Sequence, residues 1–139
     1  AANKFKHKKF IFRFHPMVNK KLFLKEYIKN RLIIPKNLII SKNSFDKDLE
    51  KSKYVIYRGS AAAIQALSLN KIIIYLNFIN ELNIDPLYML KNKFYVQKID
   101  DLKKIFFNKK IMMRNQINTA FTKQYFDKPN YFSLLNYLN

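Results

Sequence analysis

The feature that most constrains the fold is a regular alternation of short β-type runs with helix-type segments. Runs rich in β-branched and aromatic residues cover residues 9–14, 38–40, 54–57, 72–76 and 94–96. The run 72–76 is apolar throughout, as expected of a central strand buried on both faces. Helix-type segments between strands supply the crossovers that parallel strands need. We therefore predict an α/β protein with a roughly five-stranded parallel sheet covered by helices.

Capping residues predict where the helices begin and end. Asn19 is positioned to cap a helix that Pro35 terminates, and Ser44 to cap a short second helix. The alanine-rich segment 61–67 predicts a helix closed by Asn70 in a left-handed conformation. Asp85 followed by proline predicts the start of another short helix. Further helices are expected over residues 100–110, 112–125 and 130–138.

Length and composition favour one domain. The 139 residues suffice for a single core, and no internal repeat or linker interrupts them. We predict a three-layer Rossmann-like domain over 1–139, made of a basic arm (1–8), an α/β core (9–105) and C-terminal helices (106–139). No apolar run reaches ~18 residues and no secretory pattern is visible, so we expect a cytoplasmic protein. The start at Ala1 without methionine suggests a piece of a longer protein.

The chain is strongly basic. Its 27 lysines and arginines against 9 acidic residues give a net charge of +18. Such a charge favours polyanions, whether nucleic acid, an anionic membrane or a phosphorylated substrate. The lysines are spread along the chain and no arginine block occurs, so a solvated lysine-rich surface is the simpler interpretation. The absence of cysteine and the presence of only two histidines exclude thiolate and multi-histidine metal sites.

Gly59 is the only glycine of the chain and lies between a predicted strand and the alanine-rich helix. A small residue there lets a ligand approach the main chain, and the amides of such a turn can bind phosphate. Ser60 adds a hydroxyl, and Ala61 leaves the approach open. The alternative is an ordinary tight turn in which Ser60 caps the helix.

His15 follows the first strand and precedes Pro16, at the carboxyl end of that strand. Ligands of open α/β sheets bind beyond the carboxyl ends of strands, where the strand order reverses. If the first and third strands flank such a point, His15 faces Ser60 across one crevice. Arg13 and Arg58 approach the same rim. His15 can then donate a proton to a phosphate oxygen; a histidine that merely fills a loop is the alternative, as is a surface role for Arg58.

These motifs together resemble the C-terminal half of GT-B-fold glycosyltransferases. The resemblance covers about residues 9–105 and rests on Arg13-Phe14-His15-Pro16 and on the strand-turn-helix segment 53–66. It is closest to bacterial surface-polysaccharide enzymes with an HP motif and a later serine motif, of the polysialyltransferase-like and teichoic acid polymerase-like types. The resemblance implies a domain that binds a nucleotide-activated sugar or glycerol donor, with His15 and Ser60 at its phosphate.

Two departures accompany the resemblance. Many GT-B enzymes carry a glutamate that binds the donor ribose where this chain has Gln65, a neutral residue. The N-terminal half, which supplies the acceptor site in this fold, has no counterpart here. The resemblance therefore implies a donor-binding half of a transferase, inactive by itself, whose partners are a nucleotide-sugar and the missing N-terminal half. No metal and no cofactor beyond the donor substrate are expected, and the departing phosphate would be stabilised electrostatically.

Two other classes of partner suit a basic chain. A basic α/β module that binds nucleic acid is the alternative function, but no zinc-finger spacing, basic recognition helix or glycine-bearing aromatic RNA motif occurs. Most aromatic residues also fall at core-like spacing. The lysines of the arm could attract an anionic inner membrane face, although a frayed, solvated chain end is the simpler interpretation.

Overall fold

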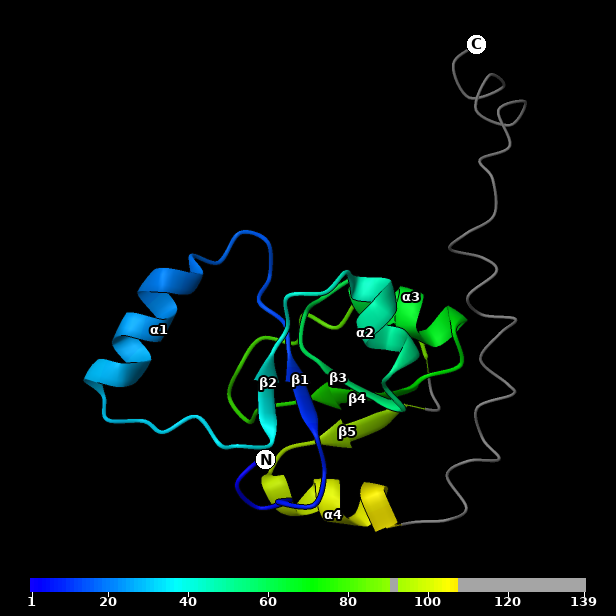
Figure 1. Ribbon diagram of the computed structural model, residues 1–139. Coiled ribbons are helices and arrows are strands. Elements are labelled where there is room, and N and C mark those ends of the chain that lie inside the picture. Colours follow the sequence, from blue (N-terminus) through cyan, green and yellow to red (C-terminus); the bar gives the residue numbers. More distant parts are fainter. Residues whose placement is uncertain (91–92, 108–139) are drawn as a thin grey trace. The chain divides into compact units, whose positions relative to one another are not determined.

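The computed structural model describes residues 1–90 and 93–107, in which strands and helices alternate (Figure 1). Their order is β1 (Phe10–Phe12), α1 (Lys20–Lys29), β2 (Leu38–Ile40), α2 (Phe45–Glu50), β3 (Tyr54–Tyr57), α3 (Ala62–Ser68), β4 (Ile72–Leu76), β5 (Phe94–Val96) and α4 (Ile99–Phe107). Each strand pair of this part of the chain is parallel. The predicted α/β class is therefore confirmed.

The prediction of one five-stranded sheet is wrong. β1 pairs with β2 in a two-stranded sheet, and β3, β4 and β5 form a separate three-stranded sheet in that order. The chain accordingly divides into two compact units, Ala1–Lys51 and a second that begins at Ser52. β1 and β3 belong to different sheets, so the neighbouring first and third strands on which a shared crevice of His15 and Ser60 is conditional are not found among the described residues. Apolar runs reveal which residues form strands, but the pairing of strands depends on contacts between segments distant in sequence, which no run encodes.

Asn37 holds the N-terminal residues of the first unit. Its side-chain amide donates to the carbonyl oxygens of Ala2, Phe5 and Lys8 at 3.0, 3.0 and 2.8 Å. The side chain of Phe5 is buried, with 3% of its surface exposed. Residues 1–8 are thus fastened to the start of β2 and do not lie free in solvent.

Helix α1 packs through aromatic side chains. Asn19 caps it as predicted, since its Oδ1 accepts from the backbone N–H groups of Lys21 and Leu22 at 3.1 and 3.2 Å. The ring of Phe23 stacks on Phe12 and meets Phe14 edge-on, at centroid distances of 6.2 and 5.1 Å. The helix ends at Lys29, earlier than the predicted stop near Pro35, because the chain turns through Arg31 with a φ of +54°.

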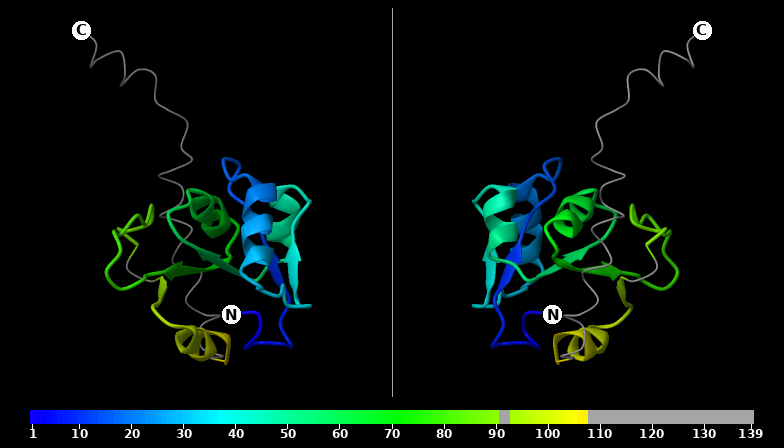
Figure 2. Two further views of the ribbon diagram at one scale, coloured as in Figure 1. Left: turned by 90° about the vertical axis from the view of Figure 1, so that its left-hand side faces the viewer. Right: turned by 90° about the vertical axis from the view of Figure 1, so that its right-hand side faces the viewer.

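The second unit has its core around β4. Four consecutive residues of this strand, Ile72–Tyr75, are buried, which confirms the central position that its apolar sequence predicts. Helices α3 and α4 lie on opposite sides of the β3–β4–β5 sheet (Figures 1 and 2). α3 contributes buried Ala63, Ala66 and Leu67, and α4 contributes Leu102 and Ile105.

The turns confirm some predicted ends and correct one. Asn70 closes α3 with a φ of +55°, as predicted. Asp85 begins a turn over residues 86–89 in place of the predicted short helix. Tyr88 N donates to Asp85 O at 3.2 Å, and this turn does not continue into an α-helix. The predicted helices at 112–125 and 130–138 lie outside the described residues. Within residues 1–90 and 93–107, no helix has the length and apolar character needed to cross a membrane.

Candidate functional site

The β3–α3 turn requires a glycine. Gly59 has a φ of +62°, in the left-handed region that side chains disfavour. A Cβ at this position would also lie 2.9 Å from Cγ1 of Ile84 and closer still to its Cδ1. The chain therefore keeps its one glycine for two reasons, a backbone conformation and a close approach. The neighbour that approaches is the Ile84 side chain, which occupies space that we had expected to be open to a ligand.

Some backbone amides of this turn are already bonded, and others are not. Ser60 Oγ accepts from Ala62 N at 3.3 Å, and Ser60 O accepts from Ala63 N at 3.1 Å. The N-cap residue of α3 is Ala61, and Ser60 lies one residue before it; the bond from Ala62 N gives the Ser60 hydroxyl a cap-like contact with the first turn of the helix. Among the described residues, the N–H groups of Gly59, Ser60 and Ala61 have no acceptor. Three consecutive donors at the carboxyl end of a parallel strand remain available to an anion.

Arg58, directly before these donors, is held in place by its own contacts. Its guanidinium carbon lies 4.9 Å from the centroid of the Phe78 ring, a cation–π arrangement. Its Nη2 forms an ion pair with Oε2 of Glu81, and the Arg58 side chain is 21% exposed. The proposed role of Arg58 as a phosphate clamp therefore requires a ligand to compete with the Glu81 carboxylate.

His15 and Pro16 lie on an exposed turn beyond β1. Val18 N donates to His15 O at 2.9 Å, and Met17 N donates to His15 Nδ1 at 3.3 Å. An Nδ1 that accepts a hydrogen bond leaves the imidazole proton on Nε2, which can then donate to an anion. The predicted position of His15 at the carboxyl end of the first strand agrees with the structure. Its convergence with Ser60 stays a prediction.

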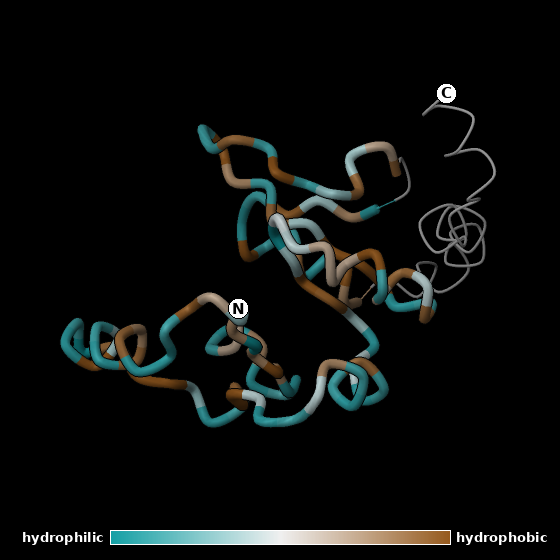
Figure 3. Tube along the Cα trace, turned by 90° about the horizontal axis from the view of Figure 1, so that it is seen from above, coloured by the Kyte–Doolittle hydropathy of each residue, from teal (hydrophilic) through white to brown (hydrophobic). Residues whose placement is uncertain are grey.

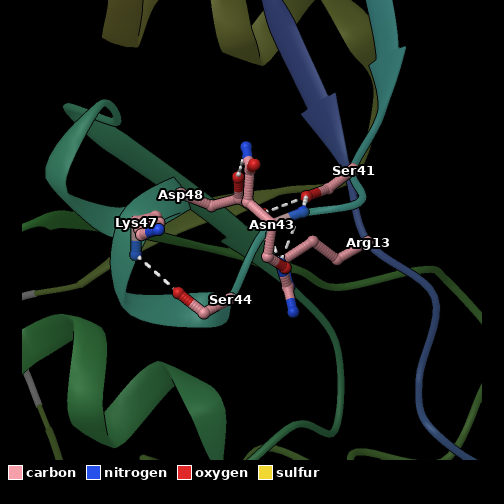
Figure 4. Close-up of polar contacts among 6 residues, drawn as sticks. All are labelled: Arg13, Ser41, Asn43, Ser44, Lys47 and Asp48. Atoms are coloured by element: carbon pink, nitrogen blue, oxygen red, sulfur yellow. Dashed lines mark hydrogen bonds and ion pairs between the residues drawn. The ribbon is translucent and has the colours of Figure 1, made fainter.

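Arg13 belongs to a polar network within the first unit (Figure 4). Its Nη1 donates to Asn43 O at 2.9 Å and to Ser41 Oγ at 3.2 Å, and forms an ion pair with Oδ2 of Asp48. Asp48 also accepts from Ser41 Oγ and, at 3.2 Å, from Asn43 Nδ2. The guanidinium thus ties the loop after β2 to helix α2, a structural task that sequence reading did not assign to it.

The Asp48 carboxyl is the charged centre of this network. Only 3% of its surface is exposed, and burial by itself raises the pKa of a carboxyl. Hydrogen bonds from Ser41, Arg13 and Asn43, together with the Arg13 charge, outweigh that effect and lower the pKa of Asp48 below its usual value. Asp48 is therefore an ionised carboxylate that accepts hydrogen bonds.

A second buried network lies in the unit that begins at Ser52. Tyr57 at the end of β3 donates from its hydroxyl to Asp85 Oδ1 at 2.8 Å, and Leu87 N donates to the same oxygen at 2.9 Å. Lys93 forms an ion pair with Asp85 Oδ2 and donates to Leu87 O, with 0% of its side-chain surface exposed. Burial, the hydrogen bond and the Asp85 charge raise the pKa of Tyr57 far above its usual value, so the phenol stays a donor.

Two further predicted site residues lie on or beside α3. Ala61 is exposed at the helix start with no side-chain cap bond, so its methyl group leaves the amides accessible. Gln65 lies one turn into the helix and is half-buried. Its backbone carbonyl oxygen accepts a hydrogen bond from Ser68 Oγ at 2.8 Å. The ribose contact that the resemblance implies for Gln65 stays a prediction.

The sequence patterns predict neither the acidic partners of Arg13 and Arg58 nor the buried ion pair of Lys93 with Asp85. Asp48 lies 35 residues after Arg13, Glu81 lies 23 residues after Arg58, and Lys93 lies 8 residues after Asp85. At these sequence separations no local pattern pairs charges. Asp85 was predicted as a helix cap, and its bond from Leu87 N retains that character. In the part of the chain that the structure describes, no three His, Asp or Glu side chains cluster to hold a metal ion.

Comparison with protein-family models, with curated proteins and with solved structures finds no match for this chain. The fold and the geometry of the β3–α3 turn therefore carry the functional argument.

Proposed function

We propose that the β3–α3 turn binds the phosphate of a nucleotide-activated sugar or glycerol donor. The observation that carries the proposal is the run of three acceptor-free amides at Gly59, Ser60 and Ala61, beside the Arg58 guanidinium. An anion at this turn gains charge-assisted hydrogen bonds from donors whose positions the backbone fixes. The parallel α/β arrangement and the basic net charge of +18 support the same ligand class.

The wider proposal is that the chain is the donor-binding half of a surface-polysaccharide glycosyltransferase or glycerophosphotransferase. It rests on the resemblance of the HP and serine motifs to GT-B enzymes. In this proposal the turn at Ser60 holds the donor phosphate, and the phosphate contact that the resemblance implies for His15 stays a prediction. The electrostatic stabilisation of the leaving phosphate is then supplied by fixed dipoles and cations.

Equilibrium titration with CMP, CDP and UDP, followed by amide shifts or thermal stability, tests the proposal. We expect saturable binding that Ser60→Ala and Arg58→Gln each weaken about tenfold, the loss of one charge-assisted hydrogen bond. Ser44→Ala is the matched control, because it removes the cap hydroxyl of α2, which accepts from Lys47 N at 3.4 Å. His15→Ala separately tests the contribution of the imidazole.

The outcomes separate the proposal from its alternative. Absence of nucleotide binding at millimolar concentration overturns it, as does equal weakening by Ser60→Ala and Ser44→Ala. A basic module that binds nucleic acid would instead bind single-stranded RNA with an affinity that falls linearly with the logarithm of the salt concentration. In that case the nucleotide diphosphates would show no saturable binding.

A further inference from the structure

The segment between β4 and the buried Asp85, residues 77–84, crosses the β3–α3 turn; we call it the strap. Both of its ends are fastened. Asn77 N donates to Val96 O at 2.9 Å at one end. At the other, Asn83 Oδ1 accepts from the Tyr75 hydroxyl and from Asp85 N, both at 3.0 Å. The strap is therefore tied to the sheet on either side of its middle.

The middle of the strap is exposed. Ile79 and Leu82 have 70% and 80% of their surface exposed, and Asn80 turns the chain with a φ of +66°. A segment that is fixed at its ends and buries little apolar surface between them opens locally at small free-energy cost. The middle can thus move while the sheet keeps its structure.

Residues of the strap contact the residues that the proposed function assigns to phosphate binding. Glu81 pairs with Arg58, the Phe78 ring lies under the same guanidinium, and the Ile84 side chain lies against Gly59. The carboxylate of Glu81 is an anion bound to a cation that we assign to phosphate binding. It stands where a phosphate oxygen would be expected to bind.

We propose that Glu81 is an internal competitor for the phosphate site, and that the strap opens at its middle when a phosphorylated ligand binds. This inference rests on the proposed function. The ligand displaces the Glu81 carboxylate from Arg58, while Phe78 keeps the guanidinium plane oriented for a bidentate contact with phosphate. Binding therefore includes the cost of breaking the Arg58–Glu81 pair, which is a partly exposed pair and hence weak enough to exchange.

Titration of the full chain with CDP and UDP, for the wild type, Glu81→Gln and Glu50→Gln, tests the inference. Both variants remove one exposed negative charge, so Glu50→Gln controls for the overall field. We expect Glu81→Gln to bind about two- to fivefold more tightly, the range of one exposed ion pair, and Glu50→Gln to match the wild type. In an Arg58→Gln background, Glu81→Gln is expected to change the affinity no further. Amide hydrogen exchange should rise over residues 78–82 when CDP is bound.

The outcomes distinguish a failure of the internal-competitor proposal from a failure of the proposed function. If the wild type binds CDP and Glu81→Gln binds it no more tightly, the internal competition is overturned while the proposed function stands. An equal gain from Glu81→Gln and Glu50→Gln also overturns it, because the effect is then one of net charge. If neither the wild type nor Glu81→Gln binds CDP or UDP, both the proposed function and the strap are overturned.

Discussion

At the residue scale, two constraints require a glycine at position 59: a left-handed backbone and a close neighbouring side chain. Its φ of +62° disfavours any side chain, and its neighbour Ile84 fills the space above it. We expect Gly59→Ala to lower the free energy of unfolding by about 1–2 kcal/mol, measured by urea denaturation. Gly59→Asn should reduce only the backbone part of this cost, since asparagine tolerates a left-handed backbone but its Cβ meets the Ile84 side chain as that of alanine does. An alanine variant as stable as the wild type would show that the turn relaxes to another conformation.

The Asp48 carboxylate makes a pH-dependent contribution to stability. Its pKa is lowered in the folded chain, so the stabilisation is present above the unfolded aspartate pKa of about 4 and is lost as the pH falls through the folded value. The difference in melting temperature between the wild type and Asp48→Asn should therefore narrow as the pH drops from about 6 to about 2. Glu50→Gln, on the same helix, should follow the wild type over this range. A constant difference between the wild type and Asp48→Asn contradicts this account.

At the element scale, the buried Lys93–Asp85 pair fixes the chain between β4 and β5. Both side chains are almost fully buried, and a buried charge that loses its partner is costly. Lys93→Met should lower the free energy of unfolding by about 3–5 kcal/mol, measured by urea denaturation. Asp85→Asn added to Lys93→Met should recover part of that loss. Lys104→Met on the exposed side of α4 is the control and should change it by less than about 0.5 kcal/mol.

The elements themselves follow closely from the sequence, but their assembly does not. The strands 38–40, 54–57, 72–76 and 94–96 have the predicted bounds because β-branched runs depend on local preference and burial. Asn19 and Ser44 cap α1 and α2 as predicted, since a cap is a contact within one turn. The separation into two sheets and the pairing of Arg58 with Glu81 depend on segments far apart in sequence, which local patterns do not specify.

At the scale of the whole molecule, charge is distributed rather than concentrated. Hydrophilic residues recur along the whole described trace (Figure 3), and the ion pairs at Arg13, Arg58 and Lys93 each join one basic side chain to one acidic side chain. In the proposed function, specific anion binding therefore depends on the fixed donors of the β3–α3 turn, and the net charge would add only a general attraction for anions. Composition predicted that attraction but could not locate it, because lysine is spread along the sequence.

The net charge of +18 itself leads to a prediction for stability. Like charges held close in the folded chain repel one another, and salt screens that repulsion over a Debye length of about 10 Å at 0.1 M. Raising NaCl from about 0.02 to 0.3 M should therefore raise the melting temperature, measured by scanning calorimetry. Pyrophosphate at matched ionic strength should raise it further in the wild type than in Arg58→Gln, because a site-bound anion stabilises the folded state beyond screening. A melting temperature that falls with NaCl would show that attractive ion pairs dominate the electrostatics of the fold.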